Sequence, residues 1–479
     1  MSNFNIPLKI KTFFDICRKN EEWCEKETFD IYGWVRTVRS SSSNLAFCNI
    51  NDGTNVSGLQ IVITEENLVQ SFTQSVKTGA YIFVKGNMVK SPSKGQDYEL
   101  NLIDFKVIGN VEDNYILGGK TRINMDTLRS IPHLRCRTNV FGSIFRIRSK
   151  LMKLLHDFYE FEGFLHLDPN VITINECEGG AGVFQITEHN MSKLNPKMYD
   201  DKLNYIWSKD HFQKPVYLTV SSQLQLEALA CGLGNVYTMN KSFRSEHSST
   251  SKHVSEFTHL EIEMITNNMD DLMIISEKMI KYCIRNILIY NKEDINNLNK
   301  FVSKGIIDKL EIILTSEFKK IKYVDIIEEI NEDIKNKKCK NLSLINNGDD
   351  LSSDHENYIT FKHGPAFITH WPSEIKSFYM KKCSDKIYCE SYDLLMPFGV
   401  GELIGASMRE DSYDVLMESI RHKKINEKDI EFYTDLRKYG TCPHGGFGLG
   451  FDRLLMLITG ITNIKDVIPF PVYYKSCSI

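Results

Sequence analysis

Hydrophobic and polar positions alternate through residues 28–110, in five short runs separated by turns rich in serine, asparagine and glycine. Alternation with a period of two predicts β-strands that bury one face. A helical pattern near residues 65–77 interrupts the series between the third and fourth runs. The five runs are FDIYGWVRTVR, LAFCNI, GLQIVI, AYIFVKGNMVK and YELNLIDFKVIG.

Five strands with a helix after the third predict a small OB-type β-barrel. Such barrels commonly bind single-stranded nucleic acid by stacking bases on exposed aromatic rings. Phe47 and Trp34 are candidates for that role. The alternative is that both rings fill the barrel core.

The rest of the chain has a different pattern. Residues 1–27 form a short amphipathic lead, the barrel covers 28–112, and 113–130 lose periodicity and gain turn residues, as linkers do. Residues 131–479 alternate long helices with strands and show no internal repeat. We therefore expect an α+β protein in which a small barrel is followed by one large mixed α+β domain.

The sharpest motif is GGFGLGFDRLLMLITG at 445–460. On a strand, Gly446, Gly448 and Gly450 fall on one face and the large residues on the other. A flat ring can lie against bare glycine backbone, while Arg453 at the start of the next helix points at a phosphate. The alternative is a strand packed closely by a helix.

A second motif, residues 236–264, reads as two strands joined by a polar loop from Ser245 to Ser255. In the returning strand Phe257, His259, Glu261 and Glu263 share one face. Arg244 ends the outgoing strand and His253 lies in the loop. The pattern suits a triphosphate with its metal ion, or alternatively the surface ion pairs of an exposed hairpin.

Two further segments indicate a binding site less specifically when each is taken alone. In 391–410, Asp393 and Glu402 are suited to Mg²⁺ and Arg409 to an anion or a carbonyl. In the helix predicted at 221–231, Gln223 and Glu227 stand four residues apart and share a face. Without context, that face reads as a solvent-exposed polar stripe.

Composition narrows the partners and the compartment. The chain has 479 residues, a formal net charge of −4 and no apolar run long enough to cross a membrane, so contact with nucleic acid must be regional. Its twelve cysteines include no Cys-x-x-Cys pair, which favours free thiols in a reducing compartment. The N-terminus lacks the features of a signal or transit peptide, so we expect a cytoplasmic location.

Together these segments resemble the class II aminoacyl-tRNA synthetases. FRSEHSSTSKHVSEFTHLEIEM is similar to the second motif of that class, and GFGLGFDR to the third. The N-terminal barrel and Pro469-Phe470-Pro471 are typical of the aspartyl, asparaginyl and lysyl subgroup. Similarity to the asparaginyl family is carried by HLRCRTNVFGSIFRIRS, YLTVSSQLQLEALACGLGNVYT, DLSSDHENY, IKSFYM and DLRKYGTCPHGGFGLGFDR.

The resemblance implies a fold and a reaction. The fold is an OB-type barrel that binds the anticodon, followed by a class II catalytic domain built on an antiparallel sheet flanked by helices. The reaction activates L-asparagine with ATP and Mg²⁺ and transfers it to the 3′-terminal adenosine of tRNA(Asn). A homodimer and no membrane association are also implied.

The resemblance also implies residue roles. Arg244 neutralises the α-phosphate, Glu246 and Phe257 hold adenine, Gly450 lines the ATP site, and His253 and Arg453 engage the γ-phosphate. Arg244, Arg453 and Glu402 are the catalytic set, with Asp393 and Glu402 on Mg²⁺. Glu178, Gln223, Glu227 and Arg409 bind the amino acid, and Arg39, Phe47 and Gln60 bind the anticodon.

Amino-acid choice is predicted to depend on Glu227 and Arg409. Glu227 would accept from the amide NH₂ of asparagine while Arg409 donates to its oxygen. Aspartate would bring a second carboxylate to Glu227. Aspartyl relatives carry a lysine at the position matching Leu226, where this chain has no cation.

The sequence departs from the family pattern in three places. In the first motif, GFLHLDPNV, the proline is at 169, one place early; Val472 stands where arginine is usual; and 178–182 contain an extra glycine.

Two alternative functions remain open from the sequence. One is an aspartyl enzyme, discriminating or not, and the other is a paralogue on the same fold that only binds RNA or makes asparagine.

Overall fold

The computed structural model describes residues 7–92, 95–118, 123–174, 182–190, 193, 195–248, 250–339 and 342–477. The chain divides into two compact units, one of residues 1–146 with 292–301, and one of residues 147–291 with 302–479. We call the first unit 1 and the second unit 2.

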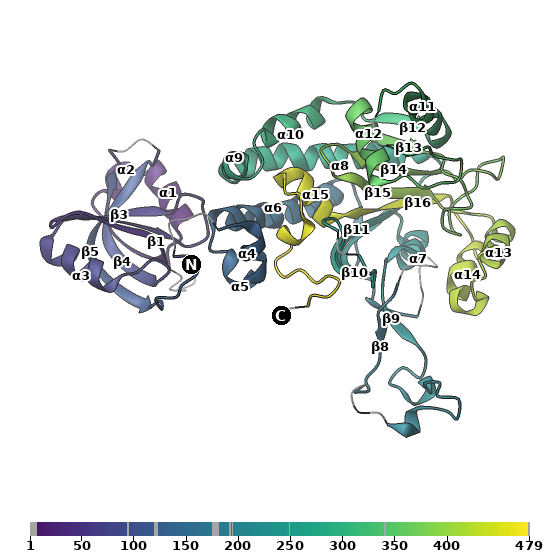
Figure 1. Cartoon of the computed structure of the whole chain (residues 1–479), viewed down its shortest axis with the longest axis horizontal. Coiled ribbons are helices and arrows are strands. Elements are labelled where there is room, and N and C mark those ends of the chain that lie inside the picture. Colours follow the sequence, from purple (N-terminus) through teal and green to yellow (C-terminus); the bar gives the residue numbers. More distant parts are fainter. Residues whose placement is uncertain are drawn as a thin grey trace. The chain divides into compact units, whose positions relative to one another are not determined.

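Unit 1 contains the predicted barrel (Figure 1). Its strands close in the order β1-β2-β3-β5-β4, with α3 between β3 and β4 as the sequence predicts. The bounds are β1 Thr28–Ser42, β2 Leu45–Asn51, β3 Leu59–Ile63, α3 Glu66–Ser75, β4 Tyr81–Lys90 and β5 Tyr98–Gly109. Alternate residues of each strand, such as Ile31, Cys48 and Ile61, are fully or almost fully buried and form the core with α1 (Ile10–Lys19).

Helices follow the barrel. They are α4 Met125–Ser130, α5 Pro132–Arg135 and α6 Asn139–Phe161, whose last turns belong to unit 2. The end of the predicted linker is therefore helical, because Asn124 caps α4 by accepting from the backbone of Thr127. A short helix, α2 (Glu21–Cys24), follows α1, and α9 (Lys292–Phe301) groups with unit 1.

Unit 2 is built on an eight-stranded sheet in the order β12-β13-β14-β15-β16-β11-β10-β6. The pairs from β13 to β10 are antiparallel, as expected, and the two edge pairs, β12 with β13 and β10 with β6, are parallel. The strands are β6 Leu165–His166, β10 Val236–Phe243, β11 Glu256–Ile265, β12 Lys319–Lys322, β13 Ala366–Thr369, β14 Ser391–Met396, β15 Gly401–Met408 and β16 His444–Gly450.

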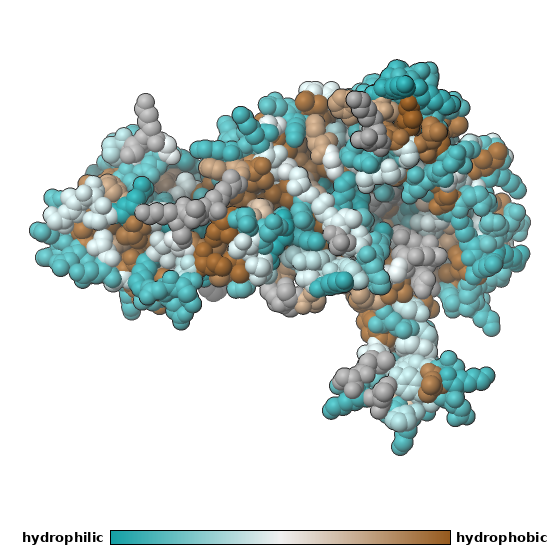
Figure 2. Space-filling view, viewed as in Figure 1, coloured by the Kyte–Doolittle hydropathy of each residue, from teal (hydrophilic) through white to brown (hydrophobic). Residues whose placement is uncertain are grey.

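Helices flank this sheet. They are α7 Gln223–Leu233, α8 Met269–Tyr290, α10 Ile306–Thr315, α11 Tyr323–Lys335, α12 Ser353–His363, α13 Tyr413–His422, α14 Glu431–Lys438 and α15 Phe451–Thr459. A small sheet of β7 (Ile172–Thr173), β9 (Val216–Leu218) and β8 (Gln185–Ile186) leads into an arm that extends from this unit (Figure 1). Hydrophilic residues cover most of the visible face of the arm (Figure 2).

The strand register assembles the candidate site. Gly448 of β16 pairs with Glu261 of β11 on one side and Gly405 of β15 on the other, and Gly405 pairs with Asp393 of β14. One row across four strands therefore carries two carboxylates with two glycines between them. None of the described helices is long and apolar enough to span a membrane.

Candidate functional site

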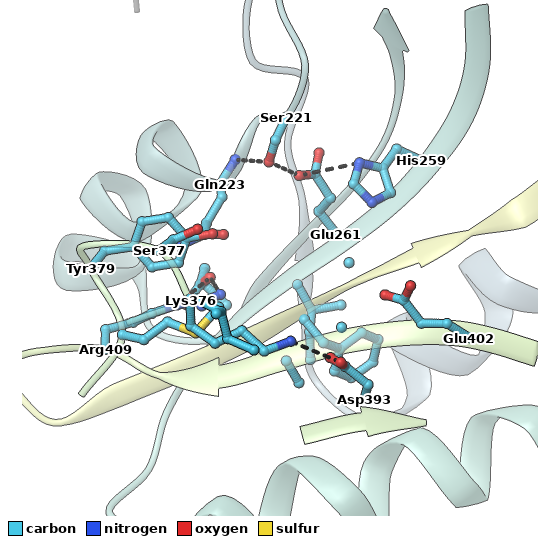
Figure 3. A pocket seen from close by; sticks show the side chains of 18 of the residues that line it. Ser221, Gln223, His259, Glu261, Lys376, Ser377, Tyr379, Asp393, Glu402 and Arg409 are labelled. Carbon is cyan, nitrogen blue, oxygen red and sulfur yellow. Dashed lines mark hydrogen bonds and ion pairs between the residues drawn. The ribbon is translucent and has the colours of Figure 1, made fainter. Parts of the chain in front are cut away.

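Two adjoining cavities open on this face of the unit 2 sheet, with volumes of about 240 Å³ and 150 Å³. They lie side by side, because five residues line both: Arg244, His259, Glu402, Gly405 and Gly448. Figure 3 shows the larger cavity, into which side chains from α7, β11, β14 and β15 converge. We call the larger cavity the inner cavity and the smaller one the outer cavity.

The outer cavity gathers the residues predicted to bind ATP. Arg244, Glu246, His253, Phe257, Glu402, Gly450 and Arg453 all line it. The Arg244 guanidinium carbon lies 5.6 Å from the centre of the Phe257 ring, so a cation stands beside a half-exposed aromatic face. Arg453 stands in the first turn of α15 and is fixed there, because its Nη1 donates to the backbone oxygen of Glu402 at 2.7 Å.

The glycine face of β16 is open for only part of its length. Gly448 and Gly450 line the outer cavity as predicted, whereas the Glu263 carboxylate covers Gly446, within 2.4 Å of where a Cβ would stand. A Cβ at Gly448 would stand 2.5 Å from Nε2 of His259. Glycine at 448 therefore makes room for the His259 ring as well as for a ligand.

His253 is placed between cations. Its Nδ1 contacts the hydroxyl groups of Ser248 and Thr250. Burial, followed by the positive charge of Arg453, lowers the pKa of the imidazole. Without an anion in the cavity, His253 is therefore neutral near pH 7.

Asp393 and Glu402 meet at the predicted metal position. Their carboxylate oxygens lie 3.7 Å and 3.4 Å from the point where a Cβ at Gly405 would stand, so glycine leaves a space that both oxygens face. Lys376 Nζ, from the segment before β14, donates to Asp393 at 2.8 Å (Figure 3). Burial and then Glu402, partly opposed by Lys376, leave the pKa of Asp393 at about 6.

A third carboxyl group, Glu356 of α12, adds to this excess of negative charge. Burial and then Glu402 raise the pKa of Glu356 to about 7. Lys252 and Arg453 oppose the rise at Glu356, as Lys376 does at Asp393. The raised pKa values therefore show that the nearby cations do not fully compensate the burial and mutual repulsion of these carboxyl groups. Oxygen donors of this type are those that Mg²⁺ prefers, so the residues fit that ion.

Glu261 fixes the start of α7. Its carboxylate accepts from the backbone of Ser222 at 2.9 Å and from the Ser221 hydroxyl, and His259 lies 3.4 Å away (Figure 3). Because an acceptor at a helix N-terminus satisfies backbone N–H groups, Glu261 orients the helix that carries Gln223. One carboxylate of the face predicted for residues 257–263, that of Glu261, therefore has a structural role.

Arg409 lines the inner cavity and is 3% exposed. Its Nε and Nη2 donate to Glu263, and its Nη1 donates to the Ser407 hydroxyl at 2.6 Å. A guanidinium has five N–H groups, so two remain for a ligand. Burial raises the pKa of Glu263 to about 7; Arg409 opposes the rise and Glu227 adds to it.

Glu227 lies beside Arg409, as predicted, with its Oε1 3.6 Å from Arg409 Nε, but it is more deeply buried than a ligand contact requires. It is fully buried and does not line either cavity. Its carboxylate already accepts from Gln223 Nε2 at 3.0 Å, the Tyr433 hydroxyl at 2.7 Å, and Arg437 Nη2 and His444 Nε2 at 3.0 Å each. The structure thus does not support direct contact between Glu227 and a ligand, and it excludes the solvent-exposed stripe.

The Glu227 cluster determines the charge and orientation of its neighbours. His444 Nε2 faces Glu227 and its Nδ1 faces the backbone oxygen of Cys442 at 2.8 Å, so both nitrogens must donate and the ring is held as imidazolium. This pairing raises the pKa of His444 in spite of its burial. Gln223 gives its NH₂ to Glu227, which leaves the amide oxygen for a ligand in the inner cavity.

In unit 1, the predicted anticodon residues share the outer face of the barrel. Arg39 pairs directly with Phe47 across β1 and β2, and Gln60 pairs with Asn49, two residues from Phe47 on the same face. Phe47 is half-exposed, because Ala46 and Cys48 fill the core instead. Trp34 also points outward, where it packs on Tyr81, so the alternative of two core rings is wrong.

Glu178 lies outside the described residues. Sequence reasoning did not assign Lys376, Tyr379, Glu356 or Glu263 to the site, although Lys376 and Tyr379 lie within the quoted segment IKSFYM. The period-two face of 257–263 marked Glu263 as available. Nothing in the sequence marked Lys376 as the partner of Asp393, because the two are brought together only by the sheet.

Comparison with known proteins agrees with this geometry. Residues 124–473 match the family model of class II tRNA synthetases (D, K and N), and 29–108 match that of an OB-fold nucleic acid binding domain. The chain is 40% identical to the asparagine–tRNA ligase of Phocaeicola vulgatus, over 92% of this chain and 94% of that one. It is also 40% identical to that of Clostridium tetani, over 95% and 96%.

Solved structures give the same result. Asparaginyl-tRNA synthetase from Pyrococcus horikoshii, complexed with asparaginyl-adenylate, is 27% identical with a TM-score of 0.83, covering 99% of this chain and 100% of that one. The Entamoeba histolytica enzyme with the same adenylate has a TM-score of 0.80 at 27% identity, covering 95% and 97%.

The lowered pKa of His253 predicts proton uptake on nucleotide binding. A triphosphate placed beside this imidazole favours its protonated form, so binding near pH 7 draws a proton into the site. Calorimetry of ATP binding in buffers of different ionisation enthalpy measures this uptake. We expect wild type to take up more protons than His253→Gln; equal uptake by both would remove His253 from the phosphate site.

Proposed function

Since the chain belongs to the class II aminoacyl-tRNA synthetases and, within them, to the asparagine–tRNA ligases, we propose that ATP binds in the outer cavity and asparagine in the inner one. The enzyme joins asparagine to its tRNA with ATP as the activating reagent. One observation carries the assignment of the two subsites. The cavities share Arg244 and Glu402 at their junction, with Arg453 and His253 at one end and Arg409 at the other.

The first step needs alignment and charge neutralisation. The asparagine α-carboxylate is already a nucleophile, so no general base is required to attack the α-phosphate of ATP. Arg244, at the junction, neutralises charge that develops on that phosphate, while Arg453 and His253 hold the γ-phosphate as pyrophosphate leaves in line. Phe257 stacks on adenine and Glu246 accepts from it.

Asp393 and Glu402 would hold Mg²⁺ beside Gly405, where the ion would neutralise phosphate charge. Lys376 Nζ donates to Asp393 at 2.8 Å and orients its carboxylate. In the second step the 3′-terminal ribose hydroxyl of tRNA(Asn) attacks the adenylate. The adenylate phosphate accepts the proton, so this step needs no side chain as a base.

Amino-acid choice follows from Arg409 and its neighbours. The two free N–H groups of Arg409 donate to the amide oxygen of asparagine, and Glu263 beside them accepts from its NH₂. Aspartate offers no donor and would bring a second carboxylate to Glu263. Glu227 does not contact the asparagine; it orients Gln223 and holds Arg437 and His444 in place.

Two further parts of the proposal concern assembly and compartment. Exposed apolar side chains around residues 163–173, namely Phe161, Leu165 and Ile172, support a homodimer through this segment. The cysteines among the described residues are free, which supports a reducing compartment such as the cytoplasm.

The first prediction concerns the phosphate contacts. Arg244→Ala and Arg453→Ala should each slow asparagine-dependent ATP–pyrophosphate exchange about 10²–10³-fold, since losing one donor to a reacting phosphate costs about 2.7–4 kcal/mol. Circular dichroism should show an intact fold. Arg421→Ala is the matched control, because Arg421 is an exposed ion-pair residue of the same unit. Exchange near the wild-type rate in either variant would exclude that arginine.

The second prediction concerns Glu227. Glu227→Gln removes the anion shared by Arg437 and His444, so asparagine exchange should fall and much of the preference over aspartate should be lost. Breaking a buried ion pair costs about 3–5 kcal/mol, so thermal melting must accompany the assay. Gln223→Leu, which cuts the link from the cavity side, should raise the asparagine KM with little loss of stability. Unchanged selectivity in Glu227→Gln, together with an unchanged asparagine KM in Gln223→Leu, would contradict the assignment.

A third prediction concerns the barrel. Phe47→Ala should weaken tRNA charging by about 1–3 kcal/mol, the value of one stacked base, and leave asparagine activation unchanged. Tyr32→Ala removes another outward aromatic ring of β1 that we do not assign to RNA, and it should charge normally. A parallel loss of activation in Phe47→Ala would mean that the ring is needed for folding.

The fourth prediction is the homodimer. Leu165→Lys places a charge among the exposed apolar residues, and sedimentation should then show a shift from dimer to monomer. An active wild-type monomer at nanomolar concentration would rule out this interface.

A further inference from the structure

Two thiols lie together behind the inner cavity. Cys231 is one turn after Glu227 on α7, and Cys442 lies two residues before His444 in the segment leading to β16. The two sulfur atoms and a ring nitrogen of His444 all lie within 4.8 Å of one another. Both cysteines are partly exposed, so a small oxidant has access.

We propose that Cys231 and Cys442 form a reversible disulfide under oxidation by a peroxide, and that this bond weakens asparagine binding. The first part depends only on the thiol pair. The second rests on the proposed function of the inner cavity.

The chemistry is complete with hydrogen peroxide as oxidant. One thiolate sulfur attacks a peroxide oxygen, giving a sulfenic acid and one water. The second sulfur then attacks the sulfenic sulfur, and the hydroxyl group leaves as a second water. Two thiols and one peroxide thus yield one disulfide and two waters.

Burial determines how readily the Cys231 thiol can react. Burial and then Cys442 raise the pKa of Cys231 to about 12, so Cys231 remains a thiol near neutral pH. The thiolate form needed for attack on peroxide is therefore scarce at Cys231 near neutral pH. We expect slow oxidation compared with the exposed Cys136 and Cys477.

Closing the bond requires movement that reaches the cavity. Sulfur atoms in a disulfide are about 2.05 Å apart, so the two side chains must come closer, and we expect the segment around Cys442 to shift toward α7 as they do. Gly440, at φ +97°, is a position in this segment where the backbone can turn. Because the backbone oxygen of Cys442 accepts from His444, and His444 donates to Glu227, the shift disturbs the carboxylate that orients Gln223.

A metal ion fits the same residues less well. Both nitrogens of His444 are already hydrogen bonded, and Arg437 lies 3.0 Å from the shared carboxylate of Glu227. A divalent cation would have to break a histidine contact and lie near a fixed positive charge. A disulfide adds no charge.

The barrel supplies an internal control. Cys17 and Cys24 also lie close to each other, but both are fully buried in the core of unit 1. Peroxide should not reach that pair in the folded protein. Oxidation should therefore distinguish the two pairs by access alone.

The experiment uses the full chain with Cys136→Ser and Cys477→Ser, which removes the exposed thiols among the described residues. After treatment with hydrogen peroxide, non-reducing digestion and mass spectrometry should find the Cys231 and Cys442 peptides joined with the loss of two hydrogens. The asparagine KM in pyrophosphate exchange should rise about tenfold, within the usual range for coupled sites, and the ATP KM should not change. A dithiol reductant should restore the original value.

Two variants in that background decide the result. Cys231→Ser should show neither the joined peptide nor the KM rise, whereas Cys17→Ser should behave like its parent. Absence of the joined peptide, an equal KM rise in Cys231→Ser, or reversal by a metal chelator would overturn the proposal. A joined peptide without any KM change would overturn its second part. If the untreated enzyme showed no asparagine-dependent exchange, the proposed function would fail while the disulfide remained measurable.

Discussion

The inner cavity depends on one buried carboxylate. Glu227 is removed from solvent, and an unpaired charge there would be prohibitively unstable. Arg437, His444, Tyr433 and Gln223 donate to it from three parts of the chain, α14, the start of β16 and α7 itself. The same contacts fix the imidazolium state of His444 and direct the Gln223 oxygen toward the cavity. Charge balance in the core thereby determines which groups the ligand meets.

Glycines in the unit 2 sheet leave space at the candidate site. Glycines at 405 and 448 leave no side chains in the row between Asp393 and Glu261, which gives the proposed nucleotide and Mg²⁺ space to approach the backbone. Two cationic side chains border this space. Arg453 is fixed there by a backbone oxygen, and Arg244 lies beside the Phe257 ring. Such preorganised charges suit a reaction that needs no base, because they need not rearrange as pyrophosphate leaves.

Local patterns predicted the elements well, because alternation and glycine spacing report directly on which side of a strand is buried. The barrel, the hairpin of β10 and β11, and the turn from β16 into α15 are all confirmed. Spacing correctly placed Glu227 on the same helix face as Gln223, since the two side chains are hydrogen bonded. Only the packing of α14 against α7 reveals that Glu227 is fully buried. Lys376 was missed for a related reason, since its partner Asp393 is 17 residues away and is reached only through the sheet.

Arg409 and Glu263, with Glu227 buried behind them, are proposed to accept an amide and to reject a carboxylate. Pyrophosphate exchange with asparagine and with aspartate, one pH unit above and one below the Glu263 pKa of about 7, tests this proposal most directly. Above that pKa the ionised Glu263 accepts from the amide and repels aspartate, so asparagine should be strongly preferred. Below it, protonated Glu263 donates to a carboxylate and the preference should shrink. A wild-type enzyme that activates aspartate as well as asparagine at the higher pH would contradict the account.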